Sequence, residues 1–122
     1  MRISTAESVV MEALWRRSPR TAEEIAADVA PEQGWTEATV KTLLNRLLTK
    51  GAVSAEKDGR RYRYKPLLER AQYVTEESKT LLDRLFDGRV SSLVMHFSER
   101  ESLSPDEIAE LKRLISELEN ER

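Results

Sequence analysis

Apolar and polar positions recur with the period of an α-helix along most of this chain. Residues 4–17 and 21–29 carry apolar side chains three or four positions apart. Each segment opens with a hydroxyl residue followed three positions later by Glu, the spacing of a capping box at the start of a helix. The pattern predicts two short amphipathic helices, with a loop at residues 31–34 after the second.

A third helix is predicted from the cap residue Thr36 to the region of Gly51, which is suited to a left-handed helix end. At roughly 100° per residue, its side chains divide into two faces. The face opposite the apolar one is small, hydrogen-bonding or cationic. The apolar face consists of Val40, Leu43, Leu44, Leu47 and Leu48.

Two short strands, 53–57 and 62–65, are predicted after this helix, joined at the turn signal Asp58-Gly59. Tyr62 and Tyr64 alternate with cations, so we expect the second strand to bury its tyrosines and expose its cations. The order of three helices and a hairpin is typical of a winged helix-turn-helix domain. The predicted fold class is mainly α with a small β-hairpin wing.

The remainder of the chain is predicted to be helical. Residues 68–86 form a long amphipathic segment, Asp87-Gly88 interrupts it, and residues 89–98 are short and apolar. Ser104 begins a third capping box ahead of a final helix, with Pro105 at its first position. We therefore expect a winged-helix domain at residues 1–66 and a helical domain at residues 67–122.

Charge is distributed unevenly between these halves. The chain has a net charge of −2, yet residues 36–66 hold eight Lys and Arg against three Asp and Glu, whereas residues 67–122 hold eight against thirteen. A basic hairpin beside a polar helix face suits the phosphates and base edges of double-stranded DNA. The candidate DNA-binding residues are Thr36, Ala38, Thr39, Lys41, Thr42, Asn45, Arg46, Arg60, Arg61 and Arg63.

The helical half has many apolar side chains but only about 55 residues in which to bury them, a size that is marginal for an independent core. We expect these helices to pair with a second copy, so that two reading helices meet the two halves of a palindromic operator. The alternative is a monomer whose helices fold back on the winged helix. The expected interface residues are Leu82, Leu85, Phe86, Leu93, Val94, Phe97, Ile108, Leu111, Leu114, Ile115 and Leu118.

The composition argues against an enzyme. The chain has no Cys, its single His is His96, and its four Gly are scattered, so Cys/His catalysis and a glycine-rich phosphate loop are excluded. His96 and Glu99 share a helical spacing but lack further ligands, so no metal or cofactor is expected. The chain has no apolar run of about 20 residues and no secretory signal at its start, so we expect a cytoplasmic protein.

Several segments, in order, resemble the penicillinase-repressor family (BlaI/MecI/CopY) of bacterial transcriptional regulators: AESVVMEALW, TAEEIA, TVKTLLNRLLTKG, KDGRRYRYKPL and LFDGRVSSLVMHF. The resemblance implies a dimeric repressor on a dyad operator. It places base and backbone contacts at Thr39, Lys41, Thr42 and Arg46, and wing contacts with phosphates at Arg60 and Arg61.

The resemblance also implies a release mechanism. In penicillin-responsive members a membrane-bound sensor metalloprotease triggers cleavage within the dimerisation domain. The matching bond here is His96–Phe97, although the better-known members have Asn where this chain has His96. The cysteine cluster of the copper-responsive branch is absent from this sequence.

Two other functions are compatible with a winged helix. One is a repressor that responds to a small ligand bound between its two domains. The other is a protein-interaction module without DNA binding, which would be expected to show an apolar outer face on the third helix or an acidic wing. Neither of those two features is present in this sequence.

Overall fold

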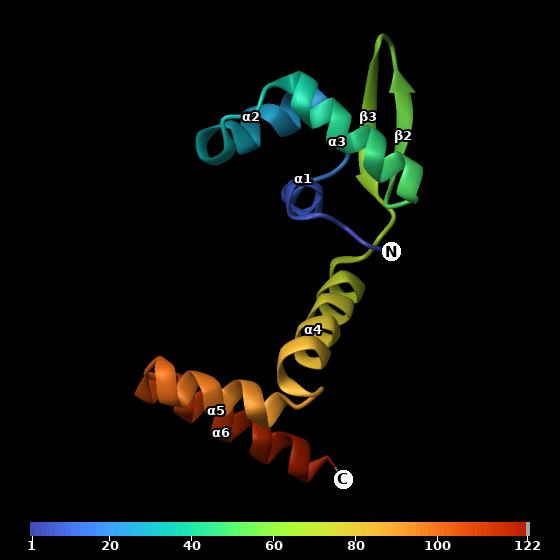
Figure 1. Cartoon of the computed structure of the whole chain (residues 1–122). Coiled ribbons are helices and arrows are strands. Elements are labelled where there is room, and N and C mark those ends of the chain that lie inside the picture. Colours follow the sequence, from blue (N-terminus) through green and yellow to red (C-terminus); the bar gives the residue numbers. More distant parts are fainter. Residues whose placement is uncertain (122) are drawn as a thin grey trace. The chain divides into compact units, whose positions relative to one another are not determined.

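The computed structural model describes residues 1–121 and shows two compact units, Met1–Val74 and the chain from Thr75 onward (Figure 1). The units divide inside helix α4 (Arg70–Phe86), whereas the sequence placed the division after residue 66. The first turn of α4 belongs to the first unit because Leu68, just before it, is buried and Tyr73 packs on the same core. The Trp15 indole N–H also donates to the Leu68 carbonyl at 2.9 Å.

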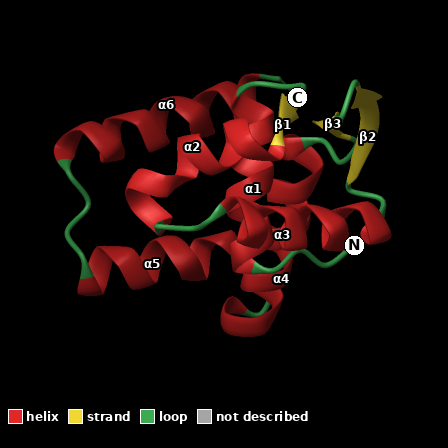
Figure 2. Ribbon diagram, turned by 90° about the horizontal axis from the view of Figure 1, so that it is seen from above, coloured by secondary structure: helices red, strands yellow, loops and turns green. Residues whose placement is uncertain are grey.

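The first unit consists of three helices and a three-stranded antiparallel sheet. Its elements are α1 (Thr5–Arg16), β1 (Arg20–Thr21), α2 (Ala22–Gln33), α3 (Glu37–Lys50), β2 (Val53–Asp58) and β3 (Arg61–Pro66). The strands lie in the order β1-β3-β2, gathered at one side of these helices (Figure 2). This arrangement confirms the predicted winged-helix class.

Local sequence signals explain where these helices begin. Ser4 and Thr21 each accept a hydrogen bond from the backbone amide three residues on, and the Glu there accepts one in return. Thr36 caps α3 by accepting from the amide of Thr39 at 3.3 Å. Ser104 accepts from the amide of Glu107 at 3.1 Å, but within residues 1–121 the return bond is formed only at the first two boxes.

Two local predictions were wrong, and one strand was not predicted. Helix α2 continues through Pro31 to Gln33, because this proline near the helix end removes only one backbone hydrogen bond before Gly34 ends the helix at φ +68°. Strand β1 is too short to show a periodic pattern, so the sequence does not predict it. The wing turn is Gly59-Arg60, because Asp58 still pairs with Arg61 in the β2–β3 ladder.

The core of the first unit draws apolar side chains from every one of its helices and from the sheet. Those fully buried or nearly so include Val10, Met11, Leu14, Ile25, Val29, Val40, Leu44, Leu47, Val53 and Tyr64. The predicted apolar face of α3 therefore lies at the centre of this core. This core holds one side of α3, and the other side of the helix is exposed to solvent.

The second unit contains the remainder of α4, helix α5 (Val90–Arg100) and helix α6 (Pro105–Asn120). Asp87 and Gly88 adopt left-handed φ angles of 51° and 74° and end α4 where the sequence predicted a break. Helices α5 and α6 lie apart in Figure 2, joined by the loop at 101–104. None of the residues of α4, α5 or α6 is buried, so this unit has no core of its own within the described chain.

Candidate nucleic-acid interface

The outer face of α3 is exposed and polar. Val40, Leu44 and Leu47 are completely buried, and the residues about half a turn away from them are at the surface. The predicted division of this helix into a buried and an exposed face is confirmed. All seven candidate contact residues within α3 and its cap are exposed: Thr36, Ala38, Thr39, Lys41, Thr42, Asn45 and Arg46.

A shallow, open hollow of about 400 Å³ runs along this face, lined by Thr42, Asn45, Arg46, Thr49 and Lys50. The Thr42 hydroxyl donates to the Ala38 carbonyl at 3.1 Å, and Thr49 bonds the Asn45 carbonyl in the same way at 3.0 Å. Their hydroxyl hydrogens are therefore used within the helix, leaving oxygen lone pairs and methyl groups at the surface.

Arg46 lines this hollow and makes no ion pair with any residue from 1 to 121. Its five N–H donors can bind the O6 and N7 acceptors of guanine in a fork geometry. Asn45 beside it carries the amide that suits adenine. The α3 face therefore combines one unpaired cation with neutral hydrogen-bonding groups.

The end of α3 carries a partly buried ion pair that the sequence did not reveal. Lys50 Nζ lies 2.6 Å from Glu7 Oε1 and also donates to the Arg2 carbonyl at 2.8 Å. Glu7 is only 1% exposed, and its Oε2 has no hydrogen-bond partner among residues 1–121. The sequence identified Glu7 only as part of a capping box, because nothing in the local pattern points to a partner so distant in the chain.

Burial alone raises the pKa of the Glu7 carboxyl, but the hydrogen bonds from Lys50 and Ser4 outweigh it and hold that pKa below its ordinary value of 4.5. Glu7 is therefore ionised at neutral pH, as its pairing with the Lys50 ammonium requires. The pair joins the first turn of α1 to the last residue of α3.

The cations of the wing differ in whether they form an ion pair. Arg60, in the turn, has no ion pair among residues 1–121, whereas Arg63 Nε donates to Asp58 Oδ2 at 2.7 Å. The Asp58 carboxylate holds the pKa of the Arg63 guanidinium above its usual range. Arg63 therefore braces the hairpin in this structure, while Arg60 and Arg61 project from it.

The two wing tyrosines do not share one environment. Tyr64 is 8% exposed, packs on the core and has a pKa raised by that burial. Tyr62 is 49% exposed, so the expectation that both tyrosines are buried is wrong for Tyr62. Although the two positions share a strand face, β3 extends beyond the body of the unit, so only Tyr64 meets the core.

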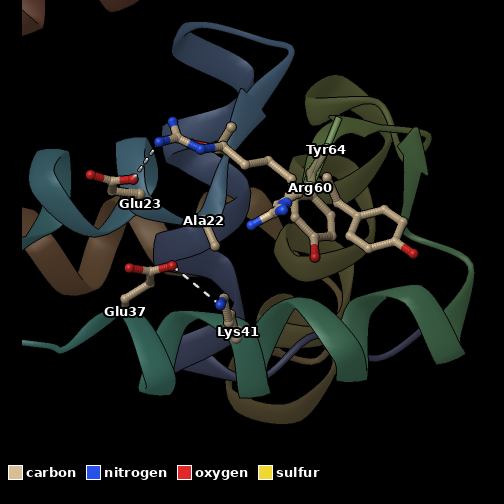
Figure 3. A pocket seen from close by; sticks show the side chains of 9 residues that line it. Ala22, Glu23, Glu37, Lys41, Arg60 and Tyr64 are labelled. Atoms are coloured by element: carbon tan, nitrogen blue, oxygen red, sulfur yellow. Dashed lines mark ion pairs between the residues drawn. The ribbon is translucent and has the colours of Figure 1, made fainter. Parts of the chain in front are cut away.

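A small cleft of about 120 Å³ lies where α2, α3 and the wing meet. Figure 3 shows Glu23 and Glu37 on one side of it and Arg60 and Tyr64 on the other. Glu37 Oε1 lies 3.2 Å from Lys41 Nζ, and Glu23 Oε2 lies 3.7 Å from Arg61 Nη2. Two of the candidate phosphate-binding cations are therefore already paired with carboxylates: Glu37 and Lys41 have the i,i+4 spacing of a helix ion pair, whereas no local pattern indicates the pairing of Glu23 with Arg61.

The second unit presents apolar side chains at its surface. Each expected interface residue lies on α4, α5 or α6, and none of them is buried. The most exposed are Leu85, Ile115 and Leu118. The bond between His96 and Phe97 lies inside α5, and the His96 ring makes edge contacts with the rings of Phe86 and Phe97 at centroid distances of 6.0 and 5.9 Å.

Comparison with known proteins identifies the family. Residues 3–117 match the family described as penicillinase repressor. The chain belongs to the penicillinase repressor family. A penicillinase repressor from Bacillus licheniformis is 33% identical over 120 residues, which cover 98% of this chain and 94% of the relative. The methicillin resistance regulatory protein MecI of Staphylococcus aureus is 33% identical over 114 residues, 93% of each chain.

A solved structure resembles the first unit of this repressor. The solution structure of the monomeric form of Bacillus licheniformis BlaI, in complex with the blaP half-operator, matches 60% of this chain and 89% of that chain. The TM-score is 0.52 and the sequence identity 33%. The predicted family and the winged-helix fold are therefore confirmed, and the chain is a DNA-binding transcriptional repressor and not an enzyme.

The described residues offer neither a metal cluster nor a membrane span. Across residues 1–121, no group of three or more His, Cys, Asp or Glu side chains is arranged to hold a metal ion. Over the same range, no helix has both the length and the apolar character needed to cross a membrane.

Proposed function

We propose that this repressor binds DNA as a homodimer, with each subunit placing α3 in the major groove of one half of a palindromic operator. The observation that carries this proposal is the α3 face, where Arg46 and Asn45 are exposed above completely buried leucines. A rigidly held helix with base-reading groups on its outer side is the requirement for direct readout.

Within that complex the residues divide by role. Arg46, Asn45 and Thr42 face base edges, while Thr36, Thr39 and Lys41 near the start of α3 contact the sugar–phosphate backbone. Ala38 allows the groove wall to approach closely because its side chain is small. The wing cations Arg60 and Arg61 bind phosphates without reading sequence, and Arg63 joins them when it is released from Asp58.

The second unit joins two copies. Its apolar side chains have no core within the described chain, and their exposure in water is unfavourable by about 25 cal/mol for each Å². Helix α6 carries Ile108, Leu111, Leu114, Ile115 and Leu118 at helical spacing, so they form one continuous stripe. Pairing this stripe and the apolar faces of α4 and α5 with a second copy would bury them.

A twofold-symmetric dimer presents two reading helices related by the same symmetry, so its operator is expected to be palindromic. The related BlaI structure, a monomeric form in complex with a half-operator, supports the assignment of one winged helix to one half-site. Bound across a promoter in the cytoplasm, such a dimer would block access of polymerase.

The family suggests that a signal relayed by a membrane-bound sensor metalloprotease releases the repressor through cleavage at His96–Phe97. This bond lies inside the described helix α5. Since a protease binds its substrate in an extended form, α5 would have to unwind locally before cleavage. Cutting there would separate α6 from α4 and so weaken the dimer.

Selection of bound sequences from a pool of random duplexes tests the proposed function. The full chain is expected to enrich a palindrome, the selected operator, whose half-sites lie about one helical turn, or a multiple of it, apart. Enrichment of no sequence, or of a single unrepeated site, would contradict the proposal.

A further inference from the structure

The cleft between α2, α3 and the wing contains negative charge on a surface that is otherwise suited to phosphate. Glu37 is paired with Lys41 and Glu23 with Arg61, at 3.2 and 3.7 Å (Figure 3). All four side chains are largely exposed, so both pairs face the solvent from which DNA would approach. Arg46 and Arg60 differ because neither has a carboxylate partner among residues 1–121.

We propose that Glu23 and Glu37 are specificity-determining residues. Their carboxylates compete with the phosphates of non-operator DNA for Lys41 and Arg61. The inference rests on the proposed function, because it requires DNA to bind across α3 and the wing. The cations attract DNA of any sequence, and the two glutamates lower the affinity for non-operator sequences.

The competition depends on how closely a phosphate is held. Exposed ion pairs are weak, so a phosphate at short distance can take Lys41 or Arg61 from its carboxylate. On the operator, base contacts from Arg46 and Asn45 fix the register and keep the phosphates close. On other sequences the complex rests almost entirely on phosphate contacts, and a loosely docked backbone cannot compensate for repulsion by the two carboxylates.

A second explanation for the glutamates is that acidic residues in the first turn stabilise a helix through its dipole. Glu23 and Glu37 do lie in the first turns of α2 and α3. However, the capping bonds there are made by other groups, since Glu24 completes the box at Thr21 and Thr36 caps α3. A dipole role would change helix stability and leave the salt dependence of DNA binding unaltered, which separates the two explanations.

The test uses the full chain and a random-sequence duplex titrated at several salt concentrations. The double variant Glu23→Gln/Glu37→Gln is expected to bind this duplex about tenfold more tightly at low salt, roughly threefold for each charge removed. Its affinity should also fall more steeply with salt. On the selected operator the gain should be smaller, so the ratio of operator to random affinity decreases.

Glu32→Gln is the matched control, because Glu32 is an exposed glutamate of α2 that does not line this cleft. It is expected to change the affinity for random duplex by less than about twofold. An equal gain in this control would overturn the proposal, since it would assign the effect to net charge alone. Unchanged affinity and salt dependence in the double variant would overturn it as well.

The Lys41→Gln background shows whether Glu37 acts through Lys41. There the Glu37→Gln change should give less than half of the gain that it gives in the wild type, because the cation it competes for has been removed. If Glu37→Gln gives the same affinity gain in the Lys41→Gln background as in the wild type, Glu37 does not act through Lys41. If the wild type shows no preference for the selected operator, the proposed function fails together with the inference. If that preference is present and the variants behave as wild type, only the inference fails.

Discussion

The two units of this repressor have similar amphipathic helices but use their apolar side chains in different ways. In the first unit Leu44 and Leu47 of α3 are completely buried in a core shared with α1, α2 and the sheet. In the second unit Leu118 is 63% exposed, and no residue of α5 or α6 is buried. A helical period therefore identifies an apolar face without telling whether the same chain covers it.

The units also differ in charge. The predicted DNA contacts all lie in the first unit, within the segment 36–66 that is strongly basic, while acidic residues predominate after residue 66. The difference suits a division of roles, in which the first unit binds DNA and the second unit, which DNA repels, binds another copy. Variants that change one unit at a time test this division of roles.

The largest effect is expected from a cavity in the first unit. Leu44→Ala should lower the free energy of unfolding by about 2–5 kcal/mol at any protein concentration, because Leu44 is completely buried in α3. Leu118→Ala is the matched change in the second unit and should instead weaken self-association. Denaturant unfolding at several concentrations measures both, and a concentration-independent loss of similar size in Leu118→Ala would contradict the comparison.

Breaking the partly buried pair at the end of α3 should have the next largest effect. Lys50→Met leaves the Glu7 carboxylate buried without its cation, so the free energy of unfolding should fall by about 2–3 kcal/mol near neutral pH. Thermal and denaturant unfolding measure this loss. Lys79→Met, in an exposed part of α4, serves as the control and should change stability by less than about 0.5 kcal/mol.

The same pair gives a pH dependence. Because the folded-state pKa of Glu7 is below its ordinary value of 4.5, its contribution to stability is complete above that value and is lost as the pH falls through the lower, folded pKa. Glu24 and Asp28 also have lowered pKa values, from hydrogen bonds with Thr21 and with Arg16 and Arg20, so they add to the acid loss. Lys50→Met should lose less stability than wild type over that range, and an identical acid profile would exclude the assignment to Glu7.

A smaller effect is expected at the reading face. Arg46→Ala should weaken binding to the selected operator by about 1–3 kcal/mol and relax the preference at one base position of each half-site. Gel-shift or fluorescence titration against single-base variants of the operator measures both. If the variant keeps the wild-type affinity and preference, Arg46 does not read a base.

The smallest effect is expected at the wing. Arg60→Ala and Arg61→Ala should each reduce the slope of log affinity against log salt by about 1 and weaken binding to all sequences alike. Titration of operator and random duplexes over a range of salt tests this. A change that depends on sequence would indicate base contacts by the wing, and an unaltered slope would indicate that the wing does not touch phosphate.

Much of the first unit could be predicted because its signals are local. Capping hydroxyls, Gly51 and the helical spacing of the leucines predicted the helices and the exposed face of α3. The family could also be predicted, because its motifs recur in order along the chain. The DNA contacts themselves stay predictions.

What the sequence did not reveal depends on contacts between distant residues. Glu7 lies in the first turn of α1 and Lys50 is the last residue of α3, so their pairing depends on how these helices pack. Glu23 meets Arg61 only because β3 returns beside α2. The difference between Tyr62 and Tyr64 depends on how far the hairpin extends beyond the core. No local pattern encodes these features, since each follows from the packing of several elements.

In the proposed dimer the second unit is completed by another copy of the chain. Sedimentation equilibrium of the full chain, without DNA, at micromolar concentrations measures this pairing. The result expected is a mass of twice the 14.0 kDa of one chain, falling to one chain in Leu114→Asp/Leu118→Asp while the winged helix stays folded. A wild-type protein that sediments as a folded monomer at these concentrations would contradict the proposed dimer.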